Sequence, residues 1–298
     1  EMSAVEPGLP PRFDTLDEAL ESLGGREQKR SPVGGGCINE CYRIELMGGQ
    51  TLFLKVNSAR CSGMFRGEAA GLLALQVDGA PRVPRPLAWG EGLGRQFLLM
   101  EWVATGRPGK GHAEELGRSL ARMHGHRMPY WGFHEDNYIG ATPQRNAKAA
   151  DWPDFYRRER LGFQVELARK RGLADAALAR KAERLAARLD TWLKPAADFP
   201  SILHGDLWAG NFMVGEDGRA VLVDPAVYYG PPEADLAMTE LFGRLDEAFY
   251  KAYDEILPRP PGYLERRDLY NLYHLLNHLN LFGGSYHGSV MAILDRYT

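Results

Sequence analysis

The sequence His204-Gly-Asp-Leu-Trp-Ala-Gly-Asn211, followed one predicted hairpin later by Val223-Asp224-Pro225, decides the fold that we expect for this chain. Phosphoryl transfer from ATP needs a carboxylate that orients the attacking hydroxyl, and oxygen ligands that hold Mg²⁺ on the phosphates. Asp206 and Asn211 have the D-x-x-x-x-N spacing of a kinase catalytic loop, and Asp224 occupies the place of the metal-binding aspartate. We therefore predict Asp206 as the catalytic base, and Asn211 and Asp224 as ligands of Mg²⁺.

The N-terminal third supplies the parts of an ATP site in the order found in kinases. A glycine-rich loop is predicted to cover the phosphates, and its residues are Gly34, Gly35, Gly36, Cys37, Ile38 and Asn39. A hairpin over 41–47 and 51–56 follows, and then a helix over 64–77. Lys55 on the second of these strands is expected to touch the α- and β-phosphates and to pair with Glu68 on the helix.

Two further predicted strands, 86–90 and 96–103, complete the small lobe. The second would offer the backbone of Glu101 and Val103 to an adenine ring, with Met100 at the back of the pocket. After 105–109 the pattern changes to long helices at 113–124, 154–193 with a break near Gly172, 233–255 and 263–281. A short helix over 15–23 precedes the sheet. The Ser201 to Pro225 stretch forms an island of short strands among the helices of the larger lobe.

These elements predict an α+β, bilobal protein-kinase-like fold. Residues 1–104 would form a small antiparallel-sheet lobe with one main helix that binds ATP. Residues 105–298 would form a larger, mostly helical lobe that carries the catalytic residues and the acceptor site. A length of 298 residues with 44% hydrophobic side chains suits two lobes, because a single core rarely grows that large.

Charge and cysteine content exclude several functions. Thirty-six basic and 39 acidic side chains nearly balance, so we expect no nucleic-acid partner and no anionic membrane partner. The three cysteines match neither a zinc ribbon nor a disulfide framework. The chain has no apolar run of 18 residues and no signal-peptide pattern, so we expect a cytoplasmic protein.

Two longer motifs suggest a family. The sequence Trp131-Gly-Phe-His-Glu-Asp-Asn-Tyr-Ile-Gly-Ala-Thr-Pro-Gln144 resembles the WGFxxDNxIGxTPQ signature of the fructosamine (ketosamine) kinases, and Leu276-Asn-His-Leu-Asn-Leu-Phe-Gly283 is similar to their C-terminal helix. The tryptophan of the HGDLWxGN loop also resembles this branch of the aminoglycoside-phosphotransferase and protein-kinase-like superfamily. The resemblance runs from about Gly24 to the C-terminus.

The resemblance implies transfer of the γ-phosphoryl group of ATP to the 3-hydroxyl of a ketosamine, either small or protein-bound. A phosphate on C3, beside the C2 carbonyl, leaves by β-elimination and frees the amine, so the implied function is deglycation. Alternatives are an aminoglycoside or choline-type kinase and a nucleotide-binding pseudokinase module. Trp208 and the 131–144 signature argue against the first, and an intact set of ATP-site residues argues against the second. A protein kinase is disfavoured because DFG and APE motifs are missing.

Candidate acceptor residues each have a structural alternative. Trp208 could stack on a sugar or amine chain, or could pack beneath the catalytic loop. His134, Asp136 and Asn137 lie in a predicted loop between helices, where they could bind substrate hydroxyls or build an Asx turn. His278 could form a polar wall of the acceptor pocket or satisfy core polarity. His204 and Asp235 are expected to support the catalytic loop through hydrogen bonds.

Cys37 lies inside the glycine-rich loop, where backbone N–H groups and an exposed turn could favour its thiolate. We hypothesise that its oxidation to an intermolecular disulfide blocks ATP binding, so the chain would be a monomer or a redox-dependent homodimer. The alternative is a small residue tolerated in a loop. Loss of activity on diamide treatment, reversed by dithiothreitol, would support the hypothesis, and unchanged activity would contradict it.

Overall fold

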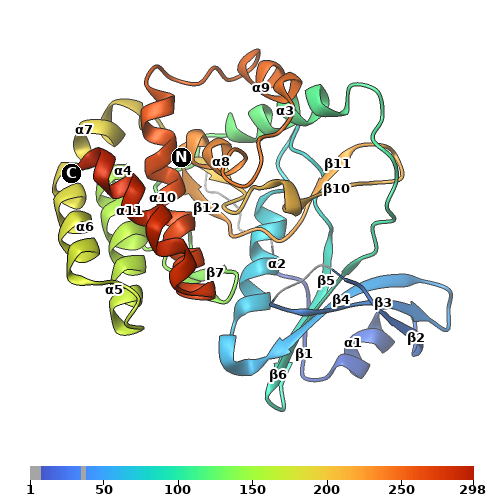
Figure 1. Ribbon diagram of the computed structural model, residues 1–298. Helices are drawn as coiled ribbons and strands as arrows, with labels where there is room; N and C mark the ends of the chain where they lie inside the picture. Colours follow the sequence, from blue (N-terminus) through green and yellow to red (C-terminus); the bar gives the residue numbers. More distant parts are fainter. Residues whose placement is uncertain (1–7, 35–37) are drawn as a thin grey trace.

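A computed structural model describes residues 8–34 and 38–298 of the chain (Figure 1). The N-terminal lobe is built on a six-stranded sheet in the order β1-β5-β6-β4-β3-β2. Only the β1–β5 pair is parallel among these described strands. The strands are β1 (Arg12–Phe13), β2 (Glu27–Pro32), β3 (Glu40–Leu46), β4 (Thr51–Ser58), β5 (Pro86–Gly92) and β6 (Arg95–Glu101).

The side chains of β6 alternate between the two faces of this sheet, and each face packs against a helix. Phe97 and Leu99 pack in a cluster with α1 (Leu16–Ser22). Leu98 and Met100 belong instead to the core shared by α2 (Met64–Ala74) and the larger lobe. The run from 96 to 100 is therefore buried throughout. The strands and helices predicted for this lobe are confirmed, whereas β1 and β2 were not predicted.

The larger lobe is mostly helical, as expected. Its helices are α3 (His112–His124), α4 (Trp152–Phe155), α5 (Phe163–Lys170), α6 (Ala176–Arg188), α7 (Asp190–Leu193), α8 (Pro232–Met238), α9 (Glu247–Asp254), α10 (Tyr263–Phe282) and α11 (His287–Tyr297). A π-helical segment, Tyr156–Gly162, joins α4 to α5. The single helix predicted over 233–255 is wrong, because the chain leaves helical geometry between α8 and α9, where Gly243 has φ +112°. Helix α11 was not predicted.

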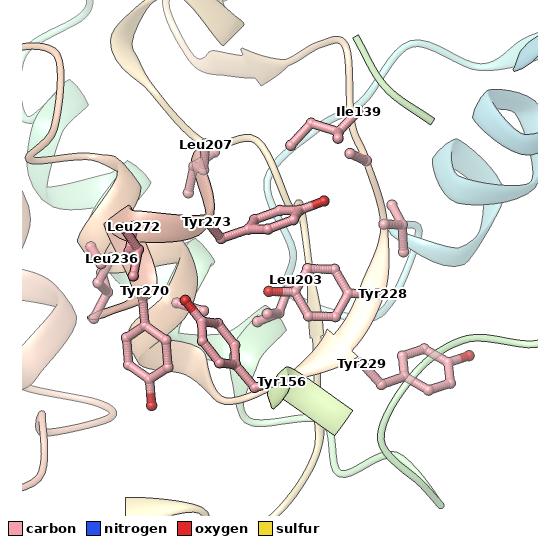
Figure 2. Packing of buried hydrophobic residues seen from close by; sticks show 14 of the residues in the cluster. Ile139, Tyr156, Leu203, Leu207, Tyr228, Tyr229, Leu236, Tyr270, Leu272 and Tyr273 are labelled. Carbon is pink, nitrogen blue, oxygen red and sulfur yellow. The ribbon is translucent and has the colours of Figure 1, made fainter. Parts of the chain in front are cut away.

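Tyrosines form the centre of this lobe (Figure 2). Tyr156, Tyr228, Tyr270 and Tyr273 pack with Leu203, Leu236 and Leu272 around one buried point. The rings of Tyr156 and Tyr270 meet edge to face, with centroids 6.2 Å apart. Helix α10 contributes two of these tyrosines, Tyr270 and Tyr273, to the cluster.

Short strands interrupt the helices of the larger lobe, both within the predicted Ser201 to Pro225 island and outside it, where β7, β8 and β12 were not predicted. They are β7 (Asn137–Ile139), β8 (Thr142–Gln144), β9 (Ser201–Leu203), β10 (Phe212–Val214), β11 (Ala220–Leu222) and β12 (Tyr228–Gly230). The predicted β10–β11 hairpin is confirmed. Of the residues predicted to lie in a loop, His134 and Asp136 are outside any strand, whereas Asn137 begins the β7–β8 hairpin, which was not predicted.

The β10–β11 hairpin is hydrogen-bonded on both sides to segments outside the larger lobe's helices. Gly106 N–H donates to Val214 O at 2.9 Å, and Gly109 N–H donates to Gly218 O at 3.1 Å. On the other side Leu222 N–H donates to Arg82 O at 2.8 Å. The segment 105–109, called the interlobe segment below, therefore lies directly against the hairpin that separates Asn211 from Asp224. The predicted lobe boundary at 104 falls between the end of β6 and the start of α3, and stays a prediction.

Among the helices of residues 8–34 and 38–298, none has the length and hydrophobicity needed to cross a lipid bilayer.

Candidate active site

The catalytic loop leaves β9 through a sharp turn at Gly205. Gly205 has φ +86°, and a Cβ there would lie 1.9 Å from the carbonyl oxygen of Ala226. Only glycine fits this position, which explains the glycine of the HGD triplet. Asp206 follows the turn, and Asn211 Nδ2 donates to the Asp206 backbone oxygen at 2.8 Å. The same amide nitrogen lies 3.3 Å from Asp206 Oδ2. The loop thus brings the predicted base and one predicted metal ligand together.

Asp235 and His204 hold this loop in place. Asp235 accepts hydrogen bonds from the backbone N–H groups of His204 at 2.7 Å and Gly205 at 2.9 Å. Although burial alone would raise the pKa of Asp235, the hydrogen bond from His124 lowers it. His204 Nδ1 accepts from the Asp206 N–H at 3.2 Å, so its Nε2–H donates to Val223 O at 2.9 Å. These contacts agree with the supporting roles expected for both residues.

Lys55 is the electrostatic centre of the nucleotide side. Its Nζ lies 2.5 Å from Glu68 Oε1 and 2.5 Å from Asp224 Oδ1. Burial alone would lower the pKa of Lys55, but the carboxylates of Asp224 and Glu68 raise it. The Lys55 charge in turn lowers the pKa of Asp224, while burial raises the pKa of Glu68. Asp224 also extends into open space, with its side chain 51% exposed, so one carboxylate serves both Lys55 and the cleft.

Asp206, the predicted catalytic base, has a strongly raised pKa. Desolvation and the neighbouring negative charge of Asp224 raise the pKa of Asp206 to about 7. A carboxyl group with a pKa near neutral pH is a stronger base than an ordinary carboxylate and is still partly deprotonated at that pH, which suits a general base.

Two cavities meet at Lys55. The first has a volume of about 260 Å³, and its lining includes Gly34, Met100, Glu101, Val103 and Lys55. The second has a volume of about 420 Å³, and its lining includes Ile38, Asn39, Asp206, Asn211, Trp208 and His278. Four residues line both cavities, namely Cys41, Lys55, Glu68 and Asp224. A nucleotide in the first cavity would direct its phosphates past Lys55 toward Asp206 in the second.

The predicted nucleotide residues divide between these cavities. Met100 lines the smaller cavity, and its expected position at the back of an adenine pocket stays a prediction. The Glu101 N–H donates to Arg85 O at 3.0 Å, so Glu101 has only its carbonyl oxygen to offer an adenine. Val103 lies past the end of β6, outside the strand ladder. Gly35, Gly36 and Cys37 lie outside the described residues, and the redox hypothesis for Cys37 stays a prediction.

Aromatic side chains form one wall of the larger cavity, called the aromatic wall below. Trp208 is 37% exposed and meets Phe242 edge to face, with ring centroids 6.2 Å apart. The ring centroids of Phe242 and His278 are 4.7 Å apart, and those of His278 and Tyr286 are 5.2 Å apart. Phe282 lines the same wall. A Cβ on Gly210 would lie 2.2 Å from the indole ring, so the glycine of WxGN makes room for Trp208.

Sequence reasoning missed Phe242, Phe282 and Tyr286. Phe242 was placed inside the predicted helix 233–255. Tyr286 precedes α11, which was not predicted. Large apolar side chains are most often buried in a core, so the sequence gives no sign that these three face a cavity. Only the fold shows it.

The three polar candidates within the 131–144 signature, His134, Asp136 and Asn137, have different surroundings. Asp136 Oδ1 accepts from the Asn146 N–H at 2.8 Å, and His134 Nε2 lies 3.3 Å from Glu135 Oε1. Neither residue lines the larger cavity. Asn137 does line it, but its side-chain amide is bonded to Val227, Gln144 and Asn146. Asp136 and Asn137 therefore bond within the protein, but to residues too distant in sequence to form an Asx turn, and a substrate contact by any of the three residues stays a prediction.

Comparison with known proteins decides the family. The fructosamine kinase family model matches residues 14–298. The chain belongs to the fructosamine kinase family. It is 40% identical over 293 residues to a protein of Synechocystis sp. described as a probable ketoamine kinase, covering 96% of this chain and 97% of that one. It is 43% identical over 272 residues to a chloroplastic protein-ribulosamine 3-kinase of Oryza sativa subsp. indica, covering 90% and 78%.

Solved structures agree with this assignment. A Thermobifida fusca protein described as a fructosamine-3-kinase has a TM-score of 0.84 and 33% identity, covering 95% of this chain and 98% of that one. Aminoglycoside phosphotransferase APH(4)-Ia has a TM-score of 0.61 at 14% identity, covering 94% and 99%, so that likeness concerns the fold alone. The predicted family and the bilobal kinase-like fold class of this fructosamine kinase family member are confirmed.

Proposed function

We propose that this chain transfers the γ-phosphoryl group of ATP to the 3-hydroxyl of a ketosamine, a fructosamine or ribulosamine on a glycated amine or protein. The single observation that carries the proposal is the junction of the two cavities at Lys55 and Asp224, with Asp206 beside it. A relative at 43% identity is named a protein-ribulosamine 3-kinase. The 3-phosphate product then loses phosphate by β-elimination, and hydrolysis by water of the imine that results releases the amine and deglycates the substrate.

In this reaction Asp206 accepts the hydrogen bond and then the proton of the acceptor hydroxyl. Its backbone is held by Asn211 and His204, so the carboxyl group keeps its place as the hydroxyl attacks. Lys55 binds the phosphates of ATP, and Glu68 keeps the ammonium group aimed at them. Catalysis is mainly positioning and charge neutralisation, as expected for phosphoryl transfer.

Asn211 and Asp224 fit a magnesium ion. Nδ2 of Asn211 donates to Asp206, which leaves the amide oxygen as the ligand atom, and the half-exposed Asp224 adds a carboxylate in the same cavity. Oxygen donors of this kind, completed by phosphate and water, suit Mg²⁺. When bound, Mg²⁺ neutralises charge on the transferring phosphates. Residues 8–34 and 38–298 hold no cluster of three or more His, Cys, Asp or Glu side chains suited to a metal.

The aromatic wall binds the ketosamine in this proposal. Trp208 offers an exposed ring for stacking on the sugar or the amine chain. Burial lowers the pKa of His278, which favours the neutral form of its imidazole. Its Nδ1–H donates to His274 O at 2.8 Å, which leaves Nε2 as an acceptor for a substrate hydroxyl.

Replacing Trp208 with alanine is expected to raise the KM for the ketosamine about tenfold and leave the KM for ATP unchanged. The reason is loss of a stacking contact worth about 1.4 kcal/mol, which corresponds to a factor of about ten in a binding constant. Steady-state kinetics with each substrate varied in turn would measure both constants. Trp208→Phe, which keeps an aromatic plane, should lose less. A Trp208→Ala enzyme with an unchanged acceptor KM but a lower melting temperature would favour the packing role instead.

The function itself is tested by ADP release with Mg·ATP and a panel of ribulosyl-lysine, fructosyl-lysine, free sugars, choline and kanamycin. We expect activity confined to the ketosamines. Activity on kanamycin or choline alone would keep a kinase but reject the proposed substrate. ATP binding without any turnover would favour the pseudokinase alternative. The cytoplasmic location and the oligomeric state stay predictions.

A further inference from the structure

Helix α2 contacts the larger lobe through two glycines. Gly67 and Gly71 are four residues apart and therefore share one face of the helix. A Cβ on Gly67 would lie 3.0 Å from Cβ of Asn137, and a Cβ on Gly71 would lie 2.9 Å from Cγ2 of Val227. The helix can approach the larger lobe this closely only because both positions lack a side chain. In Figure 1, α2 stands between the sheet and the larger lobe, beside β7.

The surface that α2 meets is held by a buried amide network. Asn137 Nδ2 donates to Val227 O at 2.7 Å, and its Oδ1 accepts from Gln144 Nε2 at 3.0 Å and Asn146 Nδ2 at 2.9 Å. Gln144 Nε2 also donates to Ala226 O at 2.9 Å, and Tyr273 Oη donates to Gln144 Oε1 at 2.7 Å. The β7–β8 hairpin is thereby bonded to the chain just after Asp224 and to helix α10.

The network contacts helix α2 and the segment 226–227, and each of these lies next to a carboxylate that is bonded to Lys55. Glu68 is the neighbour of Gly67 on α2, and its carboxylate is bonded to Lys55. Asp224 lies two residues before Ala226, and its carboxylate is bonded to the same ammonium group. Ala226 is also fixed from the other side, because its N–H donates to His204 O at 2.8 Å. A shift of the hairpin would therefore change the distance between the two carboxylates that share Lys55.

We propose that the β7–β8 hairpin, with Asn137 at its centre, is a positioning device that holds Glu68 and Asp224 against Lys55. The proposal rests on the ATP-dependent activity proposed above. Asn137 lines the larger cavity, but its side-chain amide is bonded within the protein, so in this role it acts without a contact to ATP or the acceptor. It acts through helix α2 and through the segment 226–227. Its loss is therefore expected to weaken ATP binding and to leave acceptor binding unchanged.

The test replaces Gly71 with alanine. In a helix without a close neighbour this change would stabilise the protein, because alanine has the higher helix propensity. Here the new methyl group would push α2 away from Val227 and pull Glu68 from Lys55. We expect a rise of about tenfold in the Kd for ATP, measured by titration calorimetry, and a similar rise in the KM for ATP. The KM for the ketosamine should not change.

A size exchange across the contact supplies the rescue. Val227→Ala removes the methyl group that Gly71→Ala would strike, so the double variant should recover ATP affinity to within about threefold of wild type. Gly288→Ala is the matched control, because it lies in α11 and a Cβ there has no heavy atom within 4 Å. Asn137→Ala should show the same split as Gly71→Ala, namely weaker ATP binding with an unchanged acceptor KM.

Thermal unfolding of each variant separates positioning from mere stability. If folded Gly71→Ala and Asn137→Ala enzymes bind ATP as tightly as wild type, the inference is overturned, even if their melting temperatures fall. Asn137→Ala decides the question if Gly71→Ala does not fold, because its remaining Cβ keeps the contact with α2. The proposed function fails separately, when wild-type protein binds ATP normally but phosphorylates no ketosamine.

Discussion

Replacing Asp206 with asparagine is expected to lower turnover by about 10² or more, while ATP binding stays nearly intact. The substitution keeps the shape of the side chain but removes the group that accepts the proton of the acceptor hydroxyl. Asp206 lies in the larger cavity, beyond Lys55 from the adenine side, so the Kd for ATP should change little. Single-turnover phosphorylation measures the chemical step, and calorimetry measures ATP binding.

Glu216→Gln is the matched control for this experiment. Glu216 is an exposed acid in the turn of the neighbouring β10–β11 hairpin, and its neutralisation should leave turnover at the wild-type value. An Asp206→Asn enzyme with near-normal single-turnover rates would contradict the role of Asp206 as the base.

Replacing Asp224 with asparagine is expected to lower turnover by about 10² or more, through a different cause. The amide cannot supply the negative charge that pairs with Lys55 and that would hold Mg²⁺ on the phosphates. We expect the Mg²⁺ concentration for half-maximal rate to rise by at least about tenfold. A titration of initial rate against free Mg²⁺ at saturating ATP would measure both effects.

Asp198→Asn is a suitable control, because Asp198 is exposed and lies outside both active-site cavities. The Asp206→Asn enzyme should keep a wild-type Mg²⁺ midpoint, so the two variants distinguish the base from the metal ligand. An unchanged Mg²⁺ midpoint in Asp224→Asn would show that this carboxylate does not bind the metal.

The positions of Asp206, Asn211 and Asp224 could be predicted from sequence because a local motif encodes them. The loop and the hairpin that follows it span about 20 residues, and their turns are marked by glycines. Lys55 and Glu68 followed from the order of the strands and the helix. The structure adds what the order could not show, namely that Lys55 contacts Glu68 and Asp224 at equal distances.

Longer-range features were not accessible from sequence. Asn137 is bonded to a carbonyl 90 residues further along the chain, and nothing in its own neighbourhood indicates that partner. Phe242 was hidden inside an apolar stretch that fits a helix until Gly243 adopts a positive φ. Strand β2 carries mostly polar side chains at the edge of the sheet, so it lacks the alternation that identifies a strand.

The contact between the interlobe segment and the β10–β11 hairpin limits where the chain can change length. Gly106 and Gly109 bond to the hairpin backbone, and a Cβ on Gly106 would lie 2.3 Å from Gly215 O. One inserted residue would shift this register and bring a side chain to a place where only hydrogen fits. The β5–β6 turn is less constrained: Gly94 O accepts from the Ala59 N–H at 2.9 Å, but Leu93 at the tip is 97% exposed. Insertions, tags or fused domains therefore belong at that turn and not between the lobes.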